Sequence, residues 1–376
     1  MKIVVIGTRG FPNVQGGVET HCEYLYPYIK QSGCDVTVIT RGTYVDVSLK
    51  EFKGIKLLAV NNPQKKSLEA IVHTFFAVIK ARRIGCDLLH VHAIGPALMV
   101  PFARLLGLKV VMTNHGPDYD RQKWGKAAKF MLKLGESFGS RFSNKVISIS
   151  KPIADNLKKN YGCEAVIIPN GVVVPEVIET EGALNQFGLE RNKYILTVGR
   201  FVPEKGFHDL IKAFGQSDLN KSGYKLVIVG DADHEDEYSL QLKREAKAVE
   251  GVVLSGFQKG QSLQELYSHA SLFVLPSYHE GLPIVLLEAM SYGLSCIVSD
   301  IPANRNVSLY DGRHFKPGDI QELKQKLQFY TTEVFALEES LAQIEKIRQD
   351  YDWKKISKST VEVYKKQIRG SKHQSC

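Results

Sequence analysis

Short apolar segments rich in Val and Ile alternate with longer segments of helical period throughout the chain. Strands that are apolar at almost every position are typical of parallel sheets whose two faces are both covered by helices. In the first half of the chain, the pattern predicts strands at residues 2–6, 36–40, 55–60, 88–91, 109–113, 145–149 and 165–168.

The pattern pauses after Pro169-Asn170-Gly171, in an irregular acidic stretch, and then restarts. Further strands are predicted at 194–198, 226–229, 252–254, 272–275 and 295–298, and the tail 351–367 has the period of an amphipathic helix. We therefore predict an α/β fold of two Rossmann-like, doubly wound parallel-sheet domains, over residues 1–175 and 176–351. Such sheets bind ligands at the carboxyl ends of their strands, so we expect the substrate in a cleft between the domains.

Length and composition support this organisation. A chain of 376 residues suffices for two domains, and 44% hydrophobic with 24% charged residues excludes disordered and coiled-coil proteins. The longest apolar stretches are far short of the ~20 residues that span a bilayer. The apolar run at the N-terminus is too short for a secretory signal, so we expect a cytoplasmic protein.

The positive charge of the chain is concentrated in its first half. Residues 1–175 hold 24 Lys and Arg against 12 Asp and Glu, whereas residues 176–376 hold 25 against 28. This asymmetry favours an anionic partner for the first half, although it could serve solubility alone. We expect no nucleic acid, because no known reading module or aromatic platform accompanies the charge.

The first candidate site is the loop in VVIGTRGFPNVQGGVETH, which follows a predicted strand and precedes a helix that begins near Gly17. Gly16 and Gly17 allow close approach to the backbone, and free amides at the helix start can bind an anion. The glycine spacing does not fit G-x-G-x-x-G, which disfavours a dinucleotide cofactor. A tight turn without a ligand is the alternative.

The second candidate is His115 in TNHGPDYDR, directly after the predicted strand 109–113. At the carboxyl end of a parallel strand, its imidazole would point into the cleft. There it could hydrogen-bond a sugar hydroxyl or carry a proton. The alternative is a purely structural histidine.

The second domain offers two basic residues and two carboxylates. Arg200 and Lys205, in TVGRFVPEKGF, could converge on one diphosphate. Glu280 and Glu288 form an E-x7-E pattern around a helix in which Pro283 is an early residue, with free amides at its start. A carboxylate at position 288, inside an otherwise apolar helix, would require a polar ligand such as a ribose, unless it is an exposed surface residue.

Together these segments resemble family 4 of the retaining glycosyltransferases, which have the GT-B fold. The resemblance covers nearly the whole chain, including SKPIADNL, PNGV, G-R-x4-K, E-x7-E and a Trp-bearing terminal helix. It implies that this helix returns to the first domain, so that residues 352–376 complete the N-terminal domain.

The resemblance implies how a nucleotide-sugar donor would bind. Arg200 and Lys205 would hold its diphosphate, together with the backbone amides around Leu282, Ile284 and Val285.

The sugar and the ribose would contact other residues. Glu280 and His115 would approach the donor sugar, Glu288 would take the ribose hydroxyls, and Gly16 and Gly17 would lie near the diphosphate and the acceptor. The implied catalytic residues are therefore His115, Arg200, Lys205 and Glu280.

The resemblance further implies transfer with retention, in which the leaving diphosphate helps to take the acceptor proton. Neither a cofactor nor a metal ion is expected. The D-x-D sequence Asp231-Ala232-Asp233 binds metal in the other glycosyltransferase fold, but here we interpret it as a solvated acidic loop, because further acidic residues follow it.

The implied function is transfer of a sugar to a glycan or lipid-linked acceptor in bacterial cell-surface polysaccharide synthesis. The segment SDIPANRN and the first loop resemble rhamnosyltransferases, which favours dTDP-rhamnose over UDP- or GDP-hexoses. The alternatives are a non-catalytic nucleotide-sugar sensor and a nucleotide-sugar epimerase.

Residues 121–134 have the pattern of a basic amphipathic helix. Lys126, Lys129 and Lys133 lie on one face, with Trp124, Ala128 and Met131 opposite. Such a helix could dock on an anionic membrane, which would place the protein at the inner face of the cytoplasmic membrane. An ordinary surface helix packed on the core is the alternative.

Overall fold

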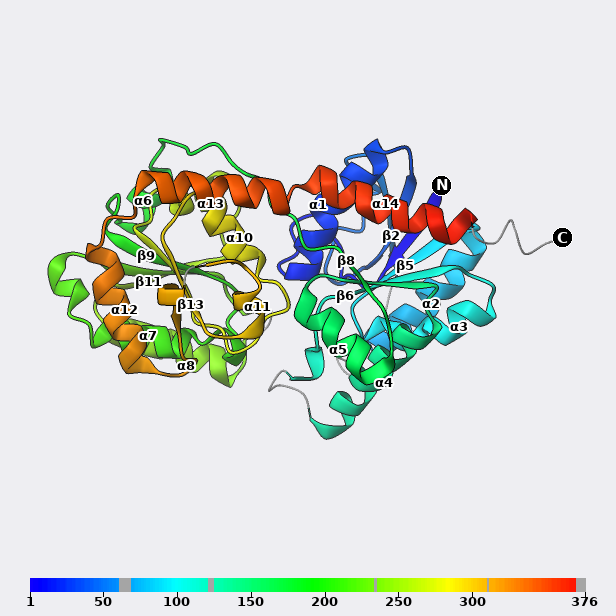
Figure 1. The fold of residues 1–376 in the computed structure, drawn as a ribbon, viewed down its shortest axis with the longest axis horizontal. Helices are drawn as coiled ribbons and strands as arrows, with labels where there is room; N and C mark the ends of the chain where they lie inside the picture. Colours follow the sequence, from blue (N-terminus) through cyan, green and yellow to red (C-terminus); the bar gives the residue numbers. More distant parts are fainter. Residues whose placement is uncertain (61–68, 121–124, 233–234, 310, 370–376) are drawn as a thin grey trace. The chain divides into compact units, whose positions relative to one another are not determined.

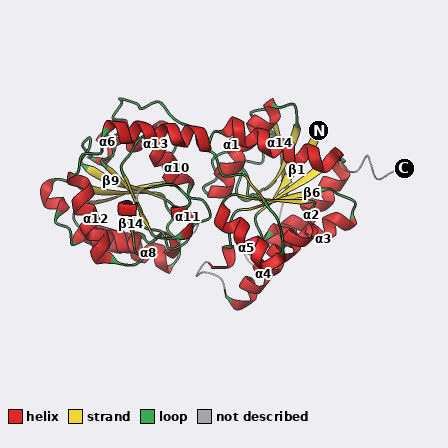
Figure 2. Cartoon of the chain, in the orientation of Figure 1, coloured by secondary structure: helices red, strands yellow, loops and turns green. Residues whose placement is uncertain are grey.

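The computed structural model describes residues 1–60, 69–120, 125–232, 235–309 and 311–369. The chain divides into two compact units (Figure 1). The first unit consists of Met1–Gly171 and Tyr351–Cys376, and the second consists of Val172–Asp350. Each unit is an α/β domain, in which helices surround a central sheet (Figure 2).

The first unit holds an eight-stranded sheet in the order β3-β4-β2-β1-β5-β6-β7-β8. Its neighbouring strands are parallel, except that β3 and β4 are antiparallel. The strands are β1 (Lys2–Ile6), β2 (Asp35–Arg41), β3 (Glu51–Phe52), β4 (Ile55–Val60), β5 (Leu88–His92), β6 (Val110–Asn114), β7 (Lys145–Ser148) and β8 (Val166–Ile167).

Helices cover both faces of this sheet because alternate residues of its strands point to opposite sides. Ile3 and Val5 of β1 belong to a core with side chains of α1 and α14, whereas Val4 and Ile6 belong to a core with α2 and α3. The helices of this unit are α1 (Gly17–Gln31), α2 (Glu69–Ile84), η1 (Pro96–Met99), α3 (Val100–Leu105), η2 (Asp118–Asp120), α4 (Lys126–Phe142), α5 (Lys151–Tyr161) and α14 (Trp353–Arg369).

The last helix, α14, is part of the core of the first unit. Trp353, Ile356, Val363 and Tyr364 are buried with residues of α1 and the sheet. The Trp353 indole packs on Gly171, where an added Cβ would lie 2.4 Å from its Cδ2 atom. A glycine is therefore needed at the point where the chain leaves the first unit.

The second unit holds a six-stranded parallel sheet in the order β11-β10-β9-β12-β13-β14. Its strands are β9 (Tyr194–Val198), β10 (Lys225–Val229), β11 (Val252–Gly256), β12 (Leu272–Leu275), β13 (Cys296–Ser299) and β14 (His314–Phe315). Its helices are α6 (Gly182–Phe187), η3 (Pro203–Lys205), α7 (Phe207–Gly215), η4 (Leu219–Ser222), α8 (Glu237–Ala248), α9 (Gly260–Ser268), α10 (Ile284–Ser291), α11 (Pro302–Arg305), η5 (Asp311–Arg313), α12 (Ile320–Thr332) and α13 (Leu337–Asp350).

The predicted fold class, two α/β domains with parallel sheets, is confirmed, and the predicted strands are found to within two residues at each end. The strands β3 and β14 were not predicted, because two residues are too few to carry a hydrophobic pattern. The helix predicted over 121–134 begins only at Lys126, and residues 121–124 lie outside the described part of the chain. Among the residues described, no helix combines the length and hydropathy needed to cross a bilayer.

Candidate functional site

The Gly-rich loop joins β1 to α1 in the first unit. Gly16 precedes the helix with φ 150°, and a Cβ there would lie 2.2 Å from Glu19 Oε2. Glu19, in the first turn of α1, accepts hydrogen bonds from the backbone N–H of Arg9 at 3.0 Å and from its guanidinium at 3.3 Å. Gly17 begins the helix, and a Cβ there would meet no atom within 4 Å. The Arg9–Glu19 pair, which was not predicted, therefore shapes the loop. The sequence signal for it is the arginine beside the loop glycines.

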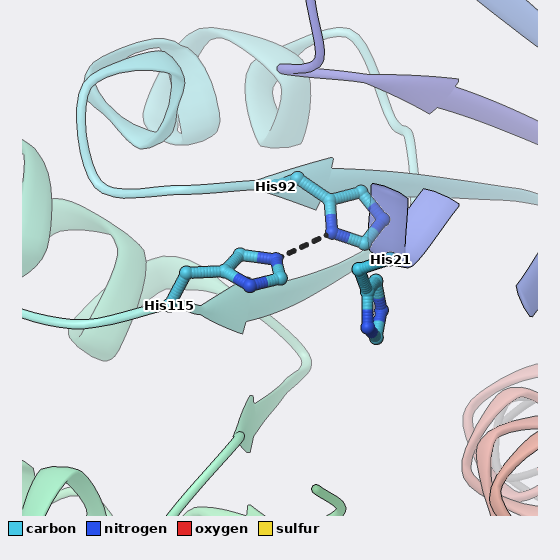
Figure 3. Close-up of side chains that lie close together, drawn as sticks. All are labelled: His21, His92 and His115. Atoms are coloured by element: carbon cyan, nitrogen blue, oxygen red, sulfur yellow. Dashed lines mark hydrogen bonds between the residues drawn. The ribbon is translucent and has the colours of Figure 1, made fainter. Parts of the chain in front are cut away.

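His115 directly follows β6, as predicted, but it lies in a cluster of histidines that was not predicted. Its Nε2 atom is 2.9 Å from Nδ1 of His92, the last residue of β5 (Figure 3). His21 of α1 lies edge-on to both rings, with centroid separations of 5.1 and 5.5 Å. The alternating sequence L-H-V-H in the fifth strand could have indicated that His90 and His92 share one face.

These histidines are neutral. Burial lowers the pKa of His115 to about 3, and it lowers the pKa of His21 and His92 well below the usual value. The neighbouring imidazoles lower each pKa further, because a second positive charge nearby is unfavourable. Each ring therefore carries one N–H donor and one acceptor nitrogen.

Among the residues that the structure describes, His21, His92 and His115 form the group that could hold a metal ion. One nitrogen of each lies within 4.8 Å of the others, and three imidazoles with one open position are a common zinc site. The expectation of metal independence stays a prediction. In the D-x-D sequence, Asp231 is paired with Lys243 at 3.1 Å, and Asp233 lies outside the described residues.

In the second unit, the loop after β9 is held against the loop after β12. Gly206 adopts φ 67°, and a Cβ there would lie 2.2 Å from the carbonyl oxygen of Pro276. The N–H of Tyr278 donates to the carbonyl of Glu204 at 2.8 Å. Because these backbones touch, Lys205 and Glu280, which are 75 residues apart, are brought together.

Lys205 and Glu280 form an ion pair, with Nζ 2.6 Å from Oε1. Only 19% of the lysine side chain and 11% of the glutamate side chain are exposed. Ser277 donates a second hydrogen bond to Oε1 at 2.6 Å. Burial alone would raise the pKa of Glu280, but the Lys205 ammonium and the two hydrogen bonds outweigh it and hold the pKa below its usual value.

Arg200 lies two residues after β9 and is half-buried. A Cβ on its neighbour Gly199 would lie 3.4 Å from Cε of Lys205, so the lysine stem runs along this backbone. The two basic residues predicted to hold one diphosphate therefore belong to one short loop. Their convergence on a single anion stays a prediction.

The helix α10 starts at Ile284, after Leu282 and Pro283. Pro283 is the N-cap residue with ψ 98°, and not the early helical residue that was predicted, since the first intrahelical bonds run to its carbonyl. The N–H groups of Ile284 and Val285 belong to the first turn, where no intrahelical acceptor exists. These amides carry partial positive charge toward whatever lies before the helix.

Glu288 lies in the second turn of α10 and is mostly buried. Its Oε2 atom accepts a hydrogen bond from the Tyr267 hydroxyl at 3.1 Å. Burial raises the pKa of Glu288 to about 7, and the single hydrogen bond lowers it only in part. The alternative of an exposed surface glutamate is therefore wrong, and the carboxylate has capacity for further donors such as ribose hydroxyls.

We expect Glu288→Gln to stabilise the protein at pH 8. The native glutamate holds a proton that the unfolded chain releases, so the wild type loses stability as pH rises from about 4.5 to 7, whereas glutamine does not ionise. The gain should be about 1–3 kcal/mol at pH 8 and should vanish near pH 4.5. Thermal unfolding across this range measures it.

Glu265 provides a control, because its replacement by glutamine should change the stability in the opposite direction. Its pKa is lowered by hydrogen bonds from the Ala183 amide and from Thr180, so Glu265→Gln should destabilise the protein above pH 4.5. A Tm difference for Glu288→Gln that does not change with pH would contradict the assignment.

Comparison with known proteins covers both units. A family model described as Glycosyltransferase Family 4 matches residues 15–174, and one described as Glycosyl transferases group 1 matches residues 183–349. The UDP-Gal:alpha-D-GlcNAc-diphosphoundecaprenol alpha-1,3-galactosyltransferase of Escherichia coli is 27% identical over 274 residues, which are 69% of each chain.

Solved structures share the fold at lower identity. The sucrose-phosphate synthase of Thermosynechococcus elongatus has a TM-score of 0.83 at 19% identity, covering 98% of this chain and 99% of its own. Anabaena HepE in complex with UDP-glucose has a TM-score of 0.77 at 19% identity, covering 96% and 99%. These likenesses establish the arrangement of the elements in each unit.

Proposed function

Since the chain belongs to the family 4 glycosyltransferases and has their GT-B fold, we propose that it transfers a sugar, with retention, from a nucleotide-diphosphate donor. The acceptor is a glycan or a lipid-linked sugar of bacterial cell-surface polysaccharide synthesis. The name of the Escherichia coli relative, which acts on a diphosphoundecaprenol acceptor, supports this class of acceptor.

The observation that carries the proposal is the Lys205–Glu280 ion pair beside the start of α10. A buried ammonium held in one place by a carboxylate can meet a diphosphate without reorganising. Arg200 adds a planar donor, and the amides of Ile284 and Val285 add the partial charge of the helix terminus.

The remaining contacts are those that the family resemblance implies, and we propose them for this chain. Glu280 accepts hydrogen bonds from the sugar, Leu282 contributes its amide near the diphosphate, and Glu288 takes the ribose hydroxyls. In the first unit, His115 approaches the donor sugar, and Gly16 and Gly17 lie near the diphosphate and the acceptor.

The proposed reaction breaks the bond between the sugar and the diphosphate oxygen, while the acceptor oxygen attacks the same face. The leaving diphosphate takes the acceptor proton. The negative charge of the leaving diphosphate is stabilised by Arg200, Lys205 and the N-terminus of α10, so we propose that no metal ion is required.

The donor is tested directly by measuring nucleotide release in EDTA from UDP-galactose, UDP-glucose, dTDP-rhamnose and GDP-mannose, with and without bacterial lipid extract. Release from one donor that lipid stimulates would support the proposal and identify the sugar. Donor binding without release would favour the sensor, donor conversion without acceptor would favour the epimerase, and release only with Mn²⁺ would overturn the metal independence.

We also propose that the protein docks on anionic membrane through α4. This helix packs through two glycines, because a Cβ on Gly135 would lie 2.1 Å from the Ile94 carbonyl oxygen and one on Gly139 would lie 2.1 Å from Met112 Sδ. Leu132 packs partly against the core, whereas Phe130 stays outside and is 66% exposed.

The exposed face of α4 combines apolar and basic side chains. Phe130 lies within one turn of Lys126, Lys129 and Lys133, positions that share one face of a helix. Met131, predicted to lie on the face opposite the lysines, is 37% exposed, so it is not buried in the core. An apolar side chain among lysines is typical of helices that lie in the membrane interface.

We expect Phe130→Ser combined with Lys126→Glu to reduce binding to phosphatidylglycerol vesicles by about tenfold or more, because both the apolar insertion and the charge attraction are lost. The matched control is Phe329→Ser combined with Lys159→Glu. Both residues are exposed, and they lie on two other helices, α12 and α5. Sedimentation with vesicles measures binding. Equal binding of both double variants would exclude α4 as the membrane contact.

A further inference from the structure

A chain of hydrogen bonds runs from His115 into the core of the first unit. Nε2 of His115 contacts Nδ1 of His92 at 2.9 Å, and Nε2 of His92 contacts the Tyr26 hydroxyl at 2.5 Å. The same hydroxyl lies 2.8 Å from Nδ1 of His90. His90, His92 and Tyr26 are fully buried, so water does not compete for these bonds.

The inner end of the chain is completed by α14. The Tyr364 hydroxyl lies 2.6 Å from Nδ1 of His90, and Nε2 of His90 lies 2.8 Å from the Thr113 hydroxyl. Burial lowers the pKa of His90 to about 3, so this ring is neutral like the others. Each imidazole therefore has one N–H donor and one lone pair. The hydrogen bonds between these groups must consequently all run the same way, each group donating to the next.

The contacts at His90 set that direction. Its Nδ1 atom faces two phenol hydroxyls, which are better hydrogen-bond donors than acceptors, so we assign the lone pair of His90 to Nδ1. The Tyr364 hydroxyl is the closer of the two donors. With Tyr364 donating to this lone pair, the Tyr26 proton faces two acceptors, the Tyr364 oxygen and Nε2 of His92. The 2.5 Å contact with His92 assigns the proton to that nitrogen. His92 must then carry its own proton on Nδ1 and donate it to Nε2 of His115. His115 keeps its proton on Nδ1.

We propose that Tyr26, His92 and Tyr364 are positioning residues that hold His115 as the Nδ1–H tautomer. Among the described residues, Nδ1 of His115 has no hydrogen-bond partner, so this N–H is available to a ligand. The inference deepens the proposed function and rests on the role given there to His115. It assigns His115 as a hydrogen-bond donor to an oxygen of the sugar donor, and not as the base that takes the acceptor proton.

A metal ion in the same cluster would require a different arrangement. It would displace the proton shared by His92 and His115 and would place two positive charges in a buried site. The group of possible ligands among the described residues consists of the three histidines alone, without a carboxylate to balance that charge. A proton-ordered chain of neutral groups avoids this cost.

A substitution at residue 364, which does not touch His115, should reverse the donor-to-acceptor direction of this hydrogen-bond chain. Two phenols of the described residues face His90 Nδ1, and in Tyr364→Phe the Tyr26 hydroxyl is the one that remains and donates to it. His92 must then donate from Nε2 to Tyr26 and accept at Nδ1. His115 would move its proton to Nε2 and present a lone pair at Nδ1, although residue 364 does not touch it.

The test is two-bond ¹H–¹⁵N correlation on the full chain labelled with [¹⁵N]histidine, without substrate and in EDTA. Signals are assigned with single His variants. We expect Nδ1–H on His92 and His115 and Nε2–H on His90 in the wild type, and the inverted tautomers of His92 and His115 in Tyr364→Phe. Tyr28→Phe, which removes a hydroxyl from the same helix as Tyr26, should leave them unchanged.

Nε2–H on His115 in the wild type, or no change in Tyr364→Phe, would overturn the proposal. In a second sample without EDTA, one equivalent of Zn²⁺ that shifts His21, His92 and His115 together would also overturn it in favour of a metal site. Because no substrate is present, these outcomes do not depend on the transferase activity. If activity is found, Tyr364→Phe should lower kcat about tenfold or more with little change in KM, because the wrong tautomer faces the reacting sugar.

Discussion

Glu280→Ala is expected to reduce nucleotide release from the sugar donor by roughly 10²–10³-fold. The substitution removes the acceptor proposed for the sugar hydroxyls and also the group that holds Lys205 Nζ at 2.6 Å. Without it, the ammonium has no fixed position from which to meet the leaving diphosphate. The measurement is the rate of nucleotide release in EDTA with the donor that the wild type uses.

Two further variants separate charge from shape. Glu280→Gln keeps the size and an acceptor for Ser277 but loses the charge that pairs with Lys205, so it should be nearly as inactive. Glu235→Ala removes an exposed carboxylate paired with Lys243 in the same unit and should keep full activity. Activity of Glu280→Ala within about threefold of the wild type would contradict the placement of the donor beside this pair.

Lys205→Met is expected to lower both activity and stability. It removes a cation proposed for the diphosphate and leaves the Glu280 carboxylate buried without its counter-charge, which typically costs about 3–5 kcal/mol. Burial then raises the pKa of Glu280, so the variant binds a proton on folding and its deficit should grow from pH 5 to pH 8. Denaturant unfolding at both pH values measures this deficit.

The double variant Lys205→Met, Glu280→Gln separates the two effects. With no buried charge left, it should recover most of the lost stability and lose the pH dependence, but it should stay inactive. Recovery of activity in the double variant would show that Lys205 serves the fold alone. A double variant as unstable as Lys205→Met would show that the ion pair is not the source of the deficit.

The strand pattern was sufficient to predict the fold because buried parallel strands are apolar at nearly every position. It also placed His115 after its strand and Lys205 and Glu280 in loops at the carboxyl ends of theirs. What it could not predict was the start of α4, since Gly125 and the lysines after it carry no capping signal.

The partners of the candidate residues were outside the reach of sequence patterns. Arg9 and Glu19 are ten residues apart, His92 and His115 are 23 apart, and Tyr364 and His90 are 274 apart. Each pairing depends on how a loop or a terminal helix packs against the sheet. The tyrosine hydroxyls and histidine imidazoles of this hydrogen-bond chain have no characteristic spacing in the sequence by which they could be recognised.

The secondary structure of this protein, and the places of the candidate residues within it, thus follow from the sequence. A strand, a helix start and a glycine turn each depend on a few adjacent residues. The state of the reactive groups was decided by tertiary structure. Burial and neighbours that are distant in sequence lower the pKa of Glu280, raise that of Glu288 to about 7 and keep the histidines neutral. Solvation and charge depend on what surrounds an atom in space, and only the folded chain defines those surroundings.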